Sequence, residues 1–407
     1  MENIREYLKG KTNFHFFGTT DKNPLTYNKD EKMVFTLKFL ADNEAVMLPF
    51  AKIMVDSDDG RLDNFYLKPD KDGVFTIETS LSCDGFLRVA AWACDENKEI
   101  IEGMPLFEGG AGVDIDKIKC ETQEPDDYFD FWKRVKDEAA AIEPEIIFEK
   151  ELKVEKGFIG KEYHLKSTAG DYASCVVVYP EDAKDKSLPI QFHYIGYAVT
   201  SLWLEYFPDR IFVFTNAHDI ENFREQSYYD ELLKTSKYKE YGFNRQENQL
   251  PDTTYWKKVY IRDFQVFNYF LNHEKFDGKS IYFAGGSQGG FQACNMAAHA
   301  DTNPATTKCE LIVPWFCDLN AIETRKRLRG WRPEPDSGLA YFDTAIAAKH
   351  LKCSVYIEAG LGDYICPPSG VSALYNGIAA EKKIDFIQGR THSFTPPEKN
   401  TFTLEKK

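Results

Sequence analysis

The sequence has few positive charges for its length and no long apolar run. It contains 50 lysines and arginines against 65 aspartates and glutamates, which gives a formal net charge of −15. Nucleic acids and anionic membrane surfaces attract basic proteins, so we expect neither as a partner. No apolar stretch approaches the length of a membrane span, and residues 1–6 do not resemble a signal peptide. These absences predict a cytoplasmic protein.

The spacings of common metal and cofactor sites are also absent. The nine cysteines include no CxxC pair, which is typical of a reducing compartment and argues against a zinc site. Gly109, Gly110 and Gly112 look like a phosphate-binding loop only superficially, because no Lys-Ser/Thr pair follows them. We therefore expect no metal and no cofactor.

A chain of 407 residues is long enough for two cores. Residues 1–120 contain short β-rich runs separated by turn residues, with little helical periodicity. The clearest runs are 35–39, 51–55, 74–77 and 86–92. This spacing predicts a small immunoglobulin-like β-sandwich domain. Such a domain can bind polysaccharide, shape an active-site rim or assemble subunits, but a plain scaffold is the simplest interpretation.

Residues 121–407 show a different pattern, in which strands alternate with helices. The first helix is expected after Asp126, and the longest amphipathic segment is 257–273. The alternation predicts an α/β fold with a mostly parallel sheet and helices on both faces. Two segments, 219–254 and 318–339, fit no core element and are expected to cover the site. The second contains the basic run Arg325–Arg329, which either binds an anionic group or forms a solvated helix face.

The most informative motif is Gly285-Gly286-Ser287-Gln288-Gly289. A β-rich run, 279–284, precedes it, and a helical pattern with small residues, 291–298, follows it. A Gly-x-Ser-x-Gly sequence between a strand and a helix is typical of a nucleophile elbow, where glycines permit a strained turn. The placement predicts a serine hydrolase with Ser287 as nucleophile.

A serine nucleophile needs a base and an acid, which in an α/β hydrolase follow it along the chain in the order acid, histidine. Asp363 follows the strand 354–359, and His392 follows the strand 384–387. Neighbouring parallel strands end at the same edge of a sheet, so we expect both side chains beside Ser287. His218 is a rival base, although it precedes the serine, and Glu358 is a rival acid, although it lies inside its strand. Asp363 could also be an ordinary turn residue.

Two backbone amides are candidates for stabilising an oxyanion. Gln288 follows the nucleophile, and Tyr197 follows the expected strand 188–195 and Gly196. These are the positions that supply the two donors in α/β hydrolases. The alternative for Gly196 and Tyr197 is a strand-ending turn covered by an aromatic ring.

Several stretches of the second domain resemble one known family. They are 127–132, 194–197, 285–290, 341–343 and 360–369. Together they make residues 124–395 similar to the acetyl xylan esterase and cephalosporin C deacetylase group of α/β hydrolases, carbohydrate esterase family 7. The block from Gly360 to Ser369 is the most specific part.

The resemblance implies an α/β-hydrolase fold, with Ser287 as nucleophile, Asp363 as acid, His392 as base, and Tyr197 and Gln288 as oxyanion donors. It also implies removal of acetyl groups from small acylated sugars without a cofactor, and a possible homo-oligomer.

Three departures from the family's pattern leave the acyl group open. Residues 217–219 replace an Arg-Gly-Gln motif, residues 198–201 replace a glycine-rich loop, and Ser393 follows His392 where glutamate is usual. The sequence therefore predicts a carboxylic ester hydrolase for O-acetylated oligosaccharides. The alternatives are an esterase or thioesterase for a larger acyl group and a catalytically silent glycan-binding protein.

Overall fold

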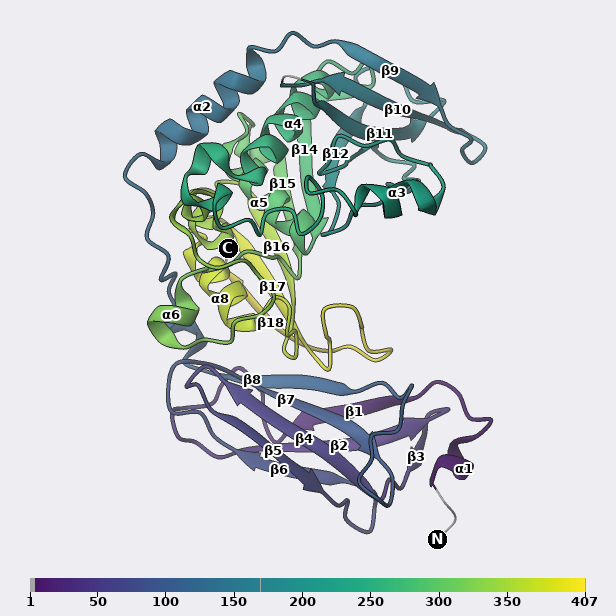
Figure 1. The fold of residues 1–407 in the computed structure, drawn as a ribbon, viewed down its shortest axis with the longest axis vertical. Helices are drawn as coiled ribbons and strands as arrows, with labels where there is room; N and C mark the ends of the chain where they lie inside the picture. Colours follow the sequence, from purple (N-terminus) through teal and green to yellow (C-terminus); the bar gives the residue numbers. More distant parts are fainter. Residues whose placement is uncertain (1–3, 169, 407) are drawn as a thin grey trace.

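The computed structural model describes residues 4–168 and 170–406. Residues 1–3, 169 and 407 lie outside the described residues. The first three belong to the stretch 1–6, which we judged unlike a signal peptide from the sequence. Figure 1 shows two parts, with the N-terminal sheets below and a larger sheet with helices above.

The N-terminal part consists of two antiparallel sheets of four strands each. After α1 (Ile4–Leu8), one sheet contains β1 (His15–Thr20), β2 (Met33–Ala41), β3 (Glu44–Val46) and β6 (Phe75–Thr79), and the other contains β5 (Leu62–Leu67), β4 (Phe50–Ser57), β7 (Gly85–Cys94) and β8 (Phe107–Val113). Alternate side chains of β2 and β4 are buried in one shared apolar core, as expected for strands with one covered face. The four predicted strands are confirmed as parts of β2, β4, β6 and β7.

The large sheet has the order β18-β17-β16-β15-β14-β12-β13-β11-β10-β9. Its strands are β9 (Ile146–Glu151), β10 (Phe158–Lys166), β11 (Tyr172–Pro180), β12 (Leu188–Tyr194), β13 (Ile211–Thr215), β14 (Phe276–Gly286), β15 (Thr307–Ile312), β16 (Ser354–Gly360), β17 (Lys382–Gln388) and β18 (Asn400–Lys406). The strands from β13 to β17 along this order run parallel, whereas β9, β10, β11 and β18 pair antiparallel. The carboxyl ends of the parallel strands therefore share one edge.

Helices and short 3-10 turns connect these strands. The helices are α2 (Tyr128–Ala140), α3 (Gln226–Leu232), α4 (Tyr255–Phe270), α5 (Gln288–His299), α6 (Ala321–Arg325), α7 (Thr344–Ala347) and α8 (Pro368–Gly377). The 3-10 turns are η1 (Ile115–Lys117), η2 (Glu247–Gln249), η3 (Pro251–Thr253), η4 (Pro304–Thr306), η5 (Ser337–Phe342) and η6 (Ala348–His350). Phe267 of α4 packs on Phe283 of β14, so α4 covers the middle of the sheet.

The prediction of helices on both faces of the sheet is wrong over β14 to β17. Lys308, Glu310 and Lys383 project from the face opposite α4 and α5 and are exposed. They line an open hollow together with Tyr282 and Tyr356. The connection after β12 forms no helix, and β17 is followed by the antiparallel strand β18, so neither connection supplies a covering helix there.

Two further properties follow from the described residues. None of the helices between residue 4 and residue 406 has the length and apolar character that crossing a bilayer requires.

All nine cysteines are free thiols, and Cys294 and Cys317 are buried as small core residues.

Candidate active site

The turn between β14 and α5 places Ser287 at the carboxyl edge of the sheet. Its backbone has φ 56° and ψ −119°, which is a strained conformation for a residue with a side chain. A Cβ at Gly289 would lie 2.0 Å from the carbonyl oxygen of Tyr194, and one at Gly285 would lie 2.4 Å from Gly289. Glycines are therefore required at these positions, because the turn packs backbone against backbone.

Ser287, His392 and Asp363 form one hydrogen-bonded chain. His392 Nδ1 lies 2.9 Å from Asp363 Oδ2, and His392 Nε2 lies 2.9 Å from Ser287 Oγ. With Asp363 ionised, Nδ1–H donates to the carboxylate, which leaves Nε2 to accept from the serine hydroxyl. The amides of Ile365 and Cys366 donate to the other carboxylate oxygen and fix its orientation.

The rival residues lie elsewhere. His218 is buried, and burial lowers its pKa to about 3, so the ring is neutral. Its Nε2–H donates to the carbonyl of Ala198 at 3.1 Å, and Nδ1 accepts from the hydroxyl of Tyr255 at 2.6 Å. Glu358 forms ion pairs with Arg390 and Lys399. Neither rival is hydrogen-bonded to Ser287.

Tyr197 and Gln288 lie on either side of the serine turn. Gly196, just before Tyr197, approaches the carbonyl of Gly286, so the loop after β12 runs beside the turn. Gln288 is the first residue of α5, where amides point out of the helix. Among the described residues, neither the amide of Tyr197 nor that of Gln288 donates to a protein acceptor. The two N–H groups therefore remain candidates for donating to an oxygen bound beside Ser287.

Tyr241 is a site residue that sequence reasoning missed. Its hydroxyl donates to Oε1 of Gln288 at 2.6 Å and accepts from the amide of Ala198 at 3.1 Å. Its ring stacks on that of Tyr197 with centroids 4.1 Å apart. The only signal in the sequence was the abundance of tyrosine in the segment 219–254, which did not identify a particular residue. One buried side chain thus connects both candidate oxyanion positions.

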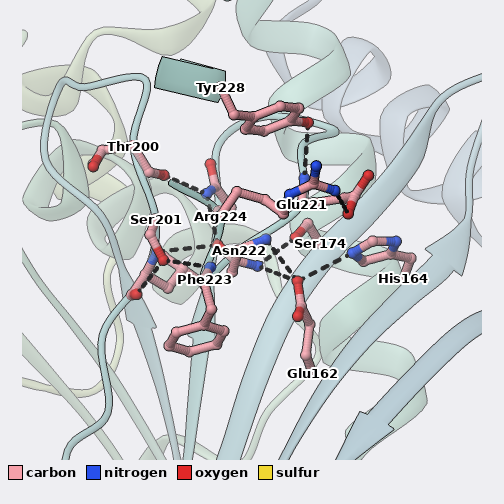
Figure 2. Close-up of polar contacts among 12 residues, drawn as sticks. Glu162, His164, Ser174, Thr200, Ser201, Glu221, Asn222, Phe223, Arg224 and Tyr228 are labelled. Carbon is pink, nitrogen blue, oxygen red and sulfur yellow. Dashed lines mark hydrogen bonds and ion pairs between the residues drawn. The ribbon is translucent and has the colours of Figure 1, made fainter. Parts of the chain in front are cut away.

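The segment after Tyr197 is anchored at a distance by Asn222 (Figure 2). Its side chain accepts from the amide of Leu202 and donates to Ser174, while its backbone amide donates to Glu162 at 2.7 Å. His164 lies 3.2 Å from the same carboxylate oxygen of Glu162. Asn222, Ser174 and the shared carboxylate oxygen of Glu162 therefore form a buried network that holds the far end of the loop that begins at Tyr197.

The surroundings of the site are aromatic. Tyr197 packs edge-on against Trp331, and Phe243 and Trp315 complete the cluster. Trp331 is 40% exposed, so one flat apolar ring faces solvent.

Each arginine of the basic run Arg325–Arg329 already has a carboxylate partner, which argues against an anion-binding role. Arg325 pairs with Glu121, Arg329 pairs with Glu334, and Arg327 is buried against Asp58 and Asp84. Arg325 and Arg327 therefore tie the segment 318–339 to residues outside it, whereas the pair of Arg329 and Glu334 lies within the segment.

Asp363, Cys366 and His392 could in principle hold a soft metal ion, because one ligand atom of each lies within 4.8 Å of the others. Asp363 and His392 are already hydrogen-bonded to each other, however, and burial raises the pKa of the Cys366 thiol well above its usual range. A metal there would have to break the chain of hydrogen bonds that reaches Ser287. In a second group, Cys120, Asp318 and Asp343, both carboxylates already accept backbone amides.

A serine at a strained strand-to-helix turn, on the edge of a mixed sheet, defines a hydrolase of the α/β-hydrolase type. Solved structures have the same fold. Acetyl xylan esterase 1 from Thermoanaerobacterium sp. JW/SL YS485 superposes with a TM-score of 0.56 at 19% identity, covering 70% of this chain and 93% of that one. The acetyl xylan esterase from Paenibacillus sp. R4 gives 0.53 at 20% identity, with 69% and 94% covered.

Sequence comparison gives the family. The family model for acetyl xylan esterase (AXE1) matches residues 112–327 and 336–405. Acetyl esterase Axe7A of Xylanibacter ruminicola is 31% identical over 141 residues, which is 32% of this chain and only 31% of that relative. The chain therefore belongs to the acetyl xylan esterase family.

Proposed function

We propose that this protein removes acetyl groups from O-acetylated oligosaccharides through an acyl-enzyme on Ser287. The observation that carries the proposal is the hydrogen-bonded chain from Ser287 through His392 to Asp363. A serine hydroxyl is a weak nucleophile by itself, and a neutral imidazole within hydrogen-bond reach makes it effective. Family membership supports an acetyl group as the one transferred.

In the first half-reaction, Ser287 Oγ attacks the acetyl carbonyl while His392 Nε2 takes its proton. Asp363 holds the ring and stabilises the imidazolium that forms. The N–H groups of Tyr197 and Gln288 donate to the oxyanion. His392 then protonates the departing sugar oxygen.

In the second half-reaction, His392 removes a proton from water, and the resulting hydroxide attacks the acyl-enzyme. Collapse of this second tetrahedral intermediate breaks the bond to Ser287, which regains its proton, and releases acetate. No cofactor takes part in these steps.

We base the proposed binding surface for the sugar on the aromatic cluster beside Tyr197. Trp331 is partly exposed and lies beside Tyr197, so its ring offers a flat apolar surface next to the oxyanion position. Flat apolar surfaces with a few polar groups suit a sugar face. The same surface would also accommodate a larger acyl group, which keeps that alternative as the second candidate.

The N-terminal sheets enter the proposal as a separate domain. We propose that residues 1–120 form an immunoglobulin-like sandwich and that residues 121–407 form the hydrolase domain. The family match supports this division, because it begins only at residue 112.

The test is acetate release from acetylated xylo-oligosaccharides by the wild type and by Ser287→Ala, with a long-chain acyl ester measured beside it. The proposal predicts release that is lost in the variant. Hydrolysis of the long-chain ester alone would keep the nucleophile and replace the substrate, and inactivity on both would favour a glycan-binding protein.

A further inference from the structure

Strand β8 of the N-terminal sheets passes against the loop that carries Asp363. A Cβ at Gly110 would lie 2.4 Å from the carbonyl oxygen of Leu361. A Cβ at Gly362 would lie 2.1 Å from the backbone carbonyl of Glu108. Real Cβ atoms do not approach so closely, so both glycines are needed for the two backbones to touch. The glycine-rich segment that resembled a phosphate loop is a close-packing surface.

The same strand also holds the segment that leads to His392. The Gln388 side chain donates to the Gly110 carbonyl at 2.9 Å and accepts from the Gly110 amide at 2.8 Å. Gln388 is the last residue of β17, and its loop continues to His392. Figure 1 shows β8 as the N-terminal strand facing the end of β17. Gly110 is therefore the point where the loops of both Asp363 and His392 meet the N-terminal sheets.

Charged side chains lie beside this contact. Glu108 is buried and lies 3.6 Å from Arg88, which pairs with Asp56 at 2.6 Å. The Arg88 guanidinium lies over the ring of Tyr364, the residue after Asp363. Burial raises the pKa of Glu108 to about 7, with Arg88 opposing and the charges of Asp363 and Asp56 adding to the increase.

A second anchor lies on the other side of the Asp363 loop. The buried carboxylate of Asp58 accepts from the amides of Phe86 and Leu328 at 2.7 Å each. It also accepts from Ser369, at the start of α8, and from Arg327, at 3.4 Å each. The loop between Gly360 and Ser369 is thus held at both ends by N-terminal residues.

We infer that strand β8, through Glu108, Gly109 and Gly110, is a positioning element that holds the loops of Asp363 and His392 in their relative geometry. The inference rests on the proposed function of these two residues. It assigns the N-terminal part a role in the chemical step, in contrast to a scaffold or a polysaccharide-binding domain. Disturbing this strand should therefore lower kcat, and by the same factor for small and large substrates.

The test compares two methyl additions in one strand. Gly110→Ala drives its methyl against Leu361, whereas Gly112→Ala drives its methyl against Phe86 and Ile115, away from the Asp363 loop. Both variants should lose stability, but only Gly110→Ala should lose kcat at temperatures well below its Tm. Misplacing a catalytic group by about 1 Å can cost up to ~100-fold, so we expect a fall of about 10- to 100-fold. KM should remain near the wild-type value.

A small aryl acetate and an acetylated xylo-oligosaccharide should be measured side by side. Equal losses of kcat on both substrates support the inference, and a loss confined to KM on the oligosaccharide overturns it in favour of glycan binding. Equal kcat in Gly110→Ala and Gly112→Ala also overturns it. If Gly110→Ala does not fold, Gln388→Ala removes the two hydrogen bonds without a clash and should give a smaller fall in kcat. A wild type inactive on both esters would instead refute the proposed function.

Discussion

The hydroxyl of Tyr241 joins Gln288 to the loop of Tyr197, because it donates to Gln288 Oε1 at 2.6 Å and accepts from the amide of Ala198 at 3.1 Å. The two candidate oxyanion donors come from different elements, the start of α5 and the loop after β12. Their relative position determines whether both amides reach one oxygen. A residue of the segment 219–254 therefore links the two candidate oxyanion positions.

Replacing Tyr241 with phenylalanine should lower kcat about 10-fold and leave KM almost unchanged, because the ring stays but the bridge is lost. Steady-state kinetics on a small acetyl ester would measure this. Tyr238→Phe is the matched control, since that hydroxyl bonds only Asp219 in the same segment. Equal kinetics in the two variants would show that the bridge has no role in the chemical step.

Gly289→Ala should be among the most destabilising single-methyl additions in the chain. The new Cβ would lie 2.0 Å from the Tyr194 carbonyl, whereas at Gly290 the nearest atom is 3.1 Å away. Overpacking costs about 1–3 kcal/mol, and a backbone clash belongs at or above the upper end. Thermal melts should show a clearly lower Tm for Gly289→Ala than for Gly290→Ala. The reverse order would mean that the turn can relax.

The raised pKa of Glu108 makes a prediction about pH. Because the folded-state pKa is about 7 and the reference value is 4.5, the folded protein binds more protons than the unfolded chain between these values. The contribution of Glu108 to the free energy of unfolding therefore falls as pH rises from about 4.5 to 7. Glu108→Gln removes this loss, so its Tm relative to wild type should increase between about pH 5 and about pH 8.

The control for this experiment is Glu102→Gln, on an exposed turn of the same N-terminal part. Its Tm difference from wild type should not change with pH. A pH-independent difference in Glu108→Gln as well would mean that Glu108 ionises as it does in the unfolded chain.

Asn222→Ala should disturb the site from a distance. The substitution leaves the amide of Leu202 and the hydroxyl of Ser174 without this partner and removes one donor to Glu162. Unsatisfied buried groups cost about 1–3 kcal/mol each, so the Tm should fall. We also expect lower kcat, because the loop from Tyr197 loses its far anchor. A fall in Tm with unchanged kcat would confine Asn222 to a structural role.

The sequence was sufficient to predict the strands that carry the three candidate catalytic residues. Ser287, Asp363 and His392 each follow a recognisable strand, and parallel strands bring their ends to one edge, so short local patterns imply a long-range arrangement. The N-terminal strands 35–39, 51–55, 74–77 and 86–92 were predictable because β-rich runs separated by turn residues indicate strands directly. Burial alternates along β2, β4 and β6, whereas β7 is covered on both faces.

Contacts between distant segments were not predictable in the same way. Gly110 and Leu361 approach only because two parts of the chain dock, and a glycine pair in sequence does not show what it packs against. Tyr241 is one of several tyrosines in its segment, and only the fold selects it. The open face of β14 to β17 was missed because the strand β18 follows β17, where the fold class led us to expect a helix.

The most direct test of the account is covalent labelling of the active protein with a fluorophosphonate, followed by peptide mapping and measurement of residual acetate release. The account predicts a single labelled residue, Ser287, with loss of activity in proportion to labelling, because an activated serine is the group that such a probe modifies. Full acetate release from protein labelled at Ser287, or from Ser287→Ala, would contradict it.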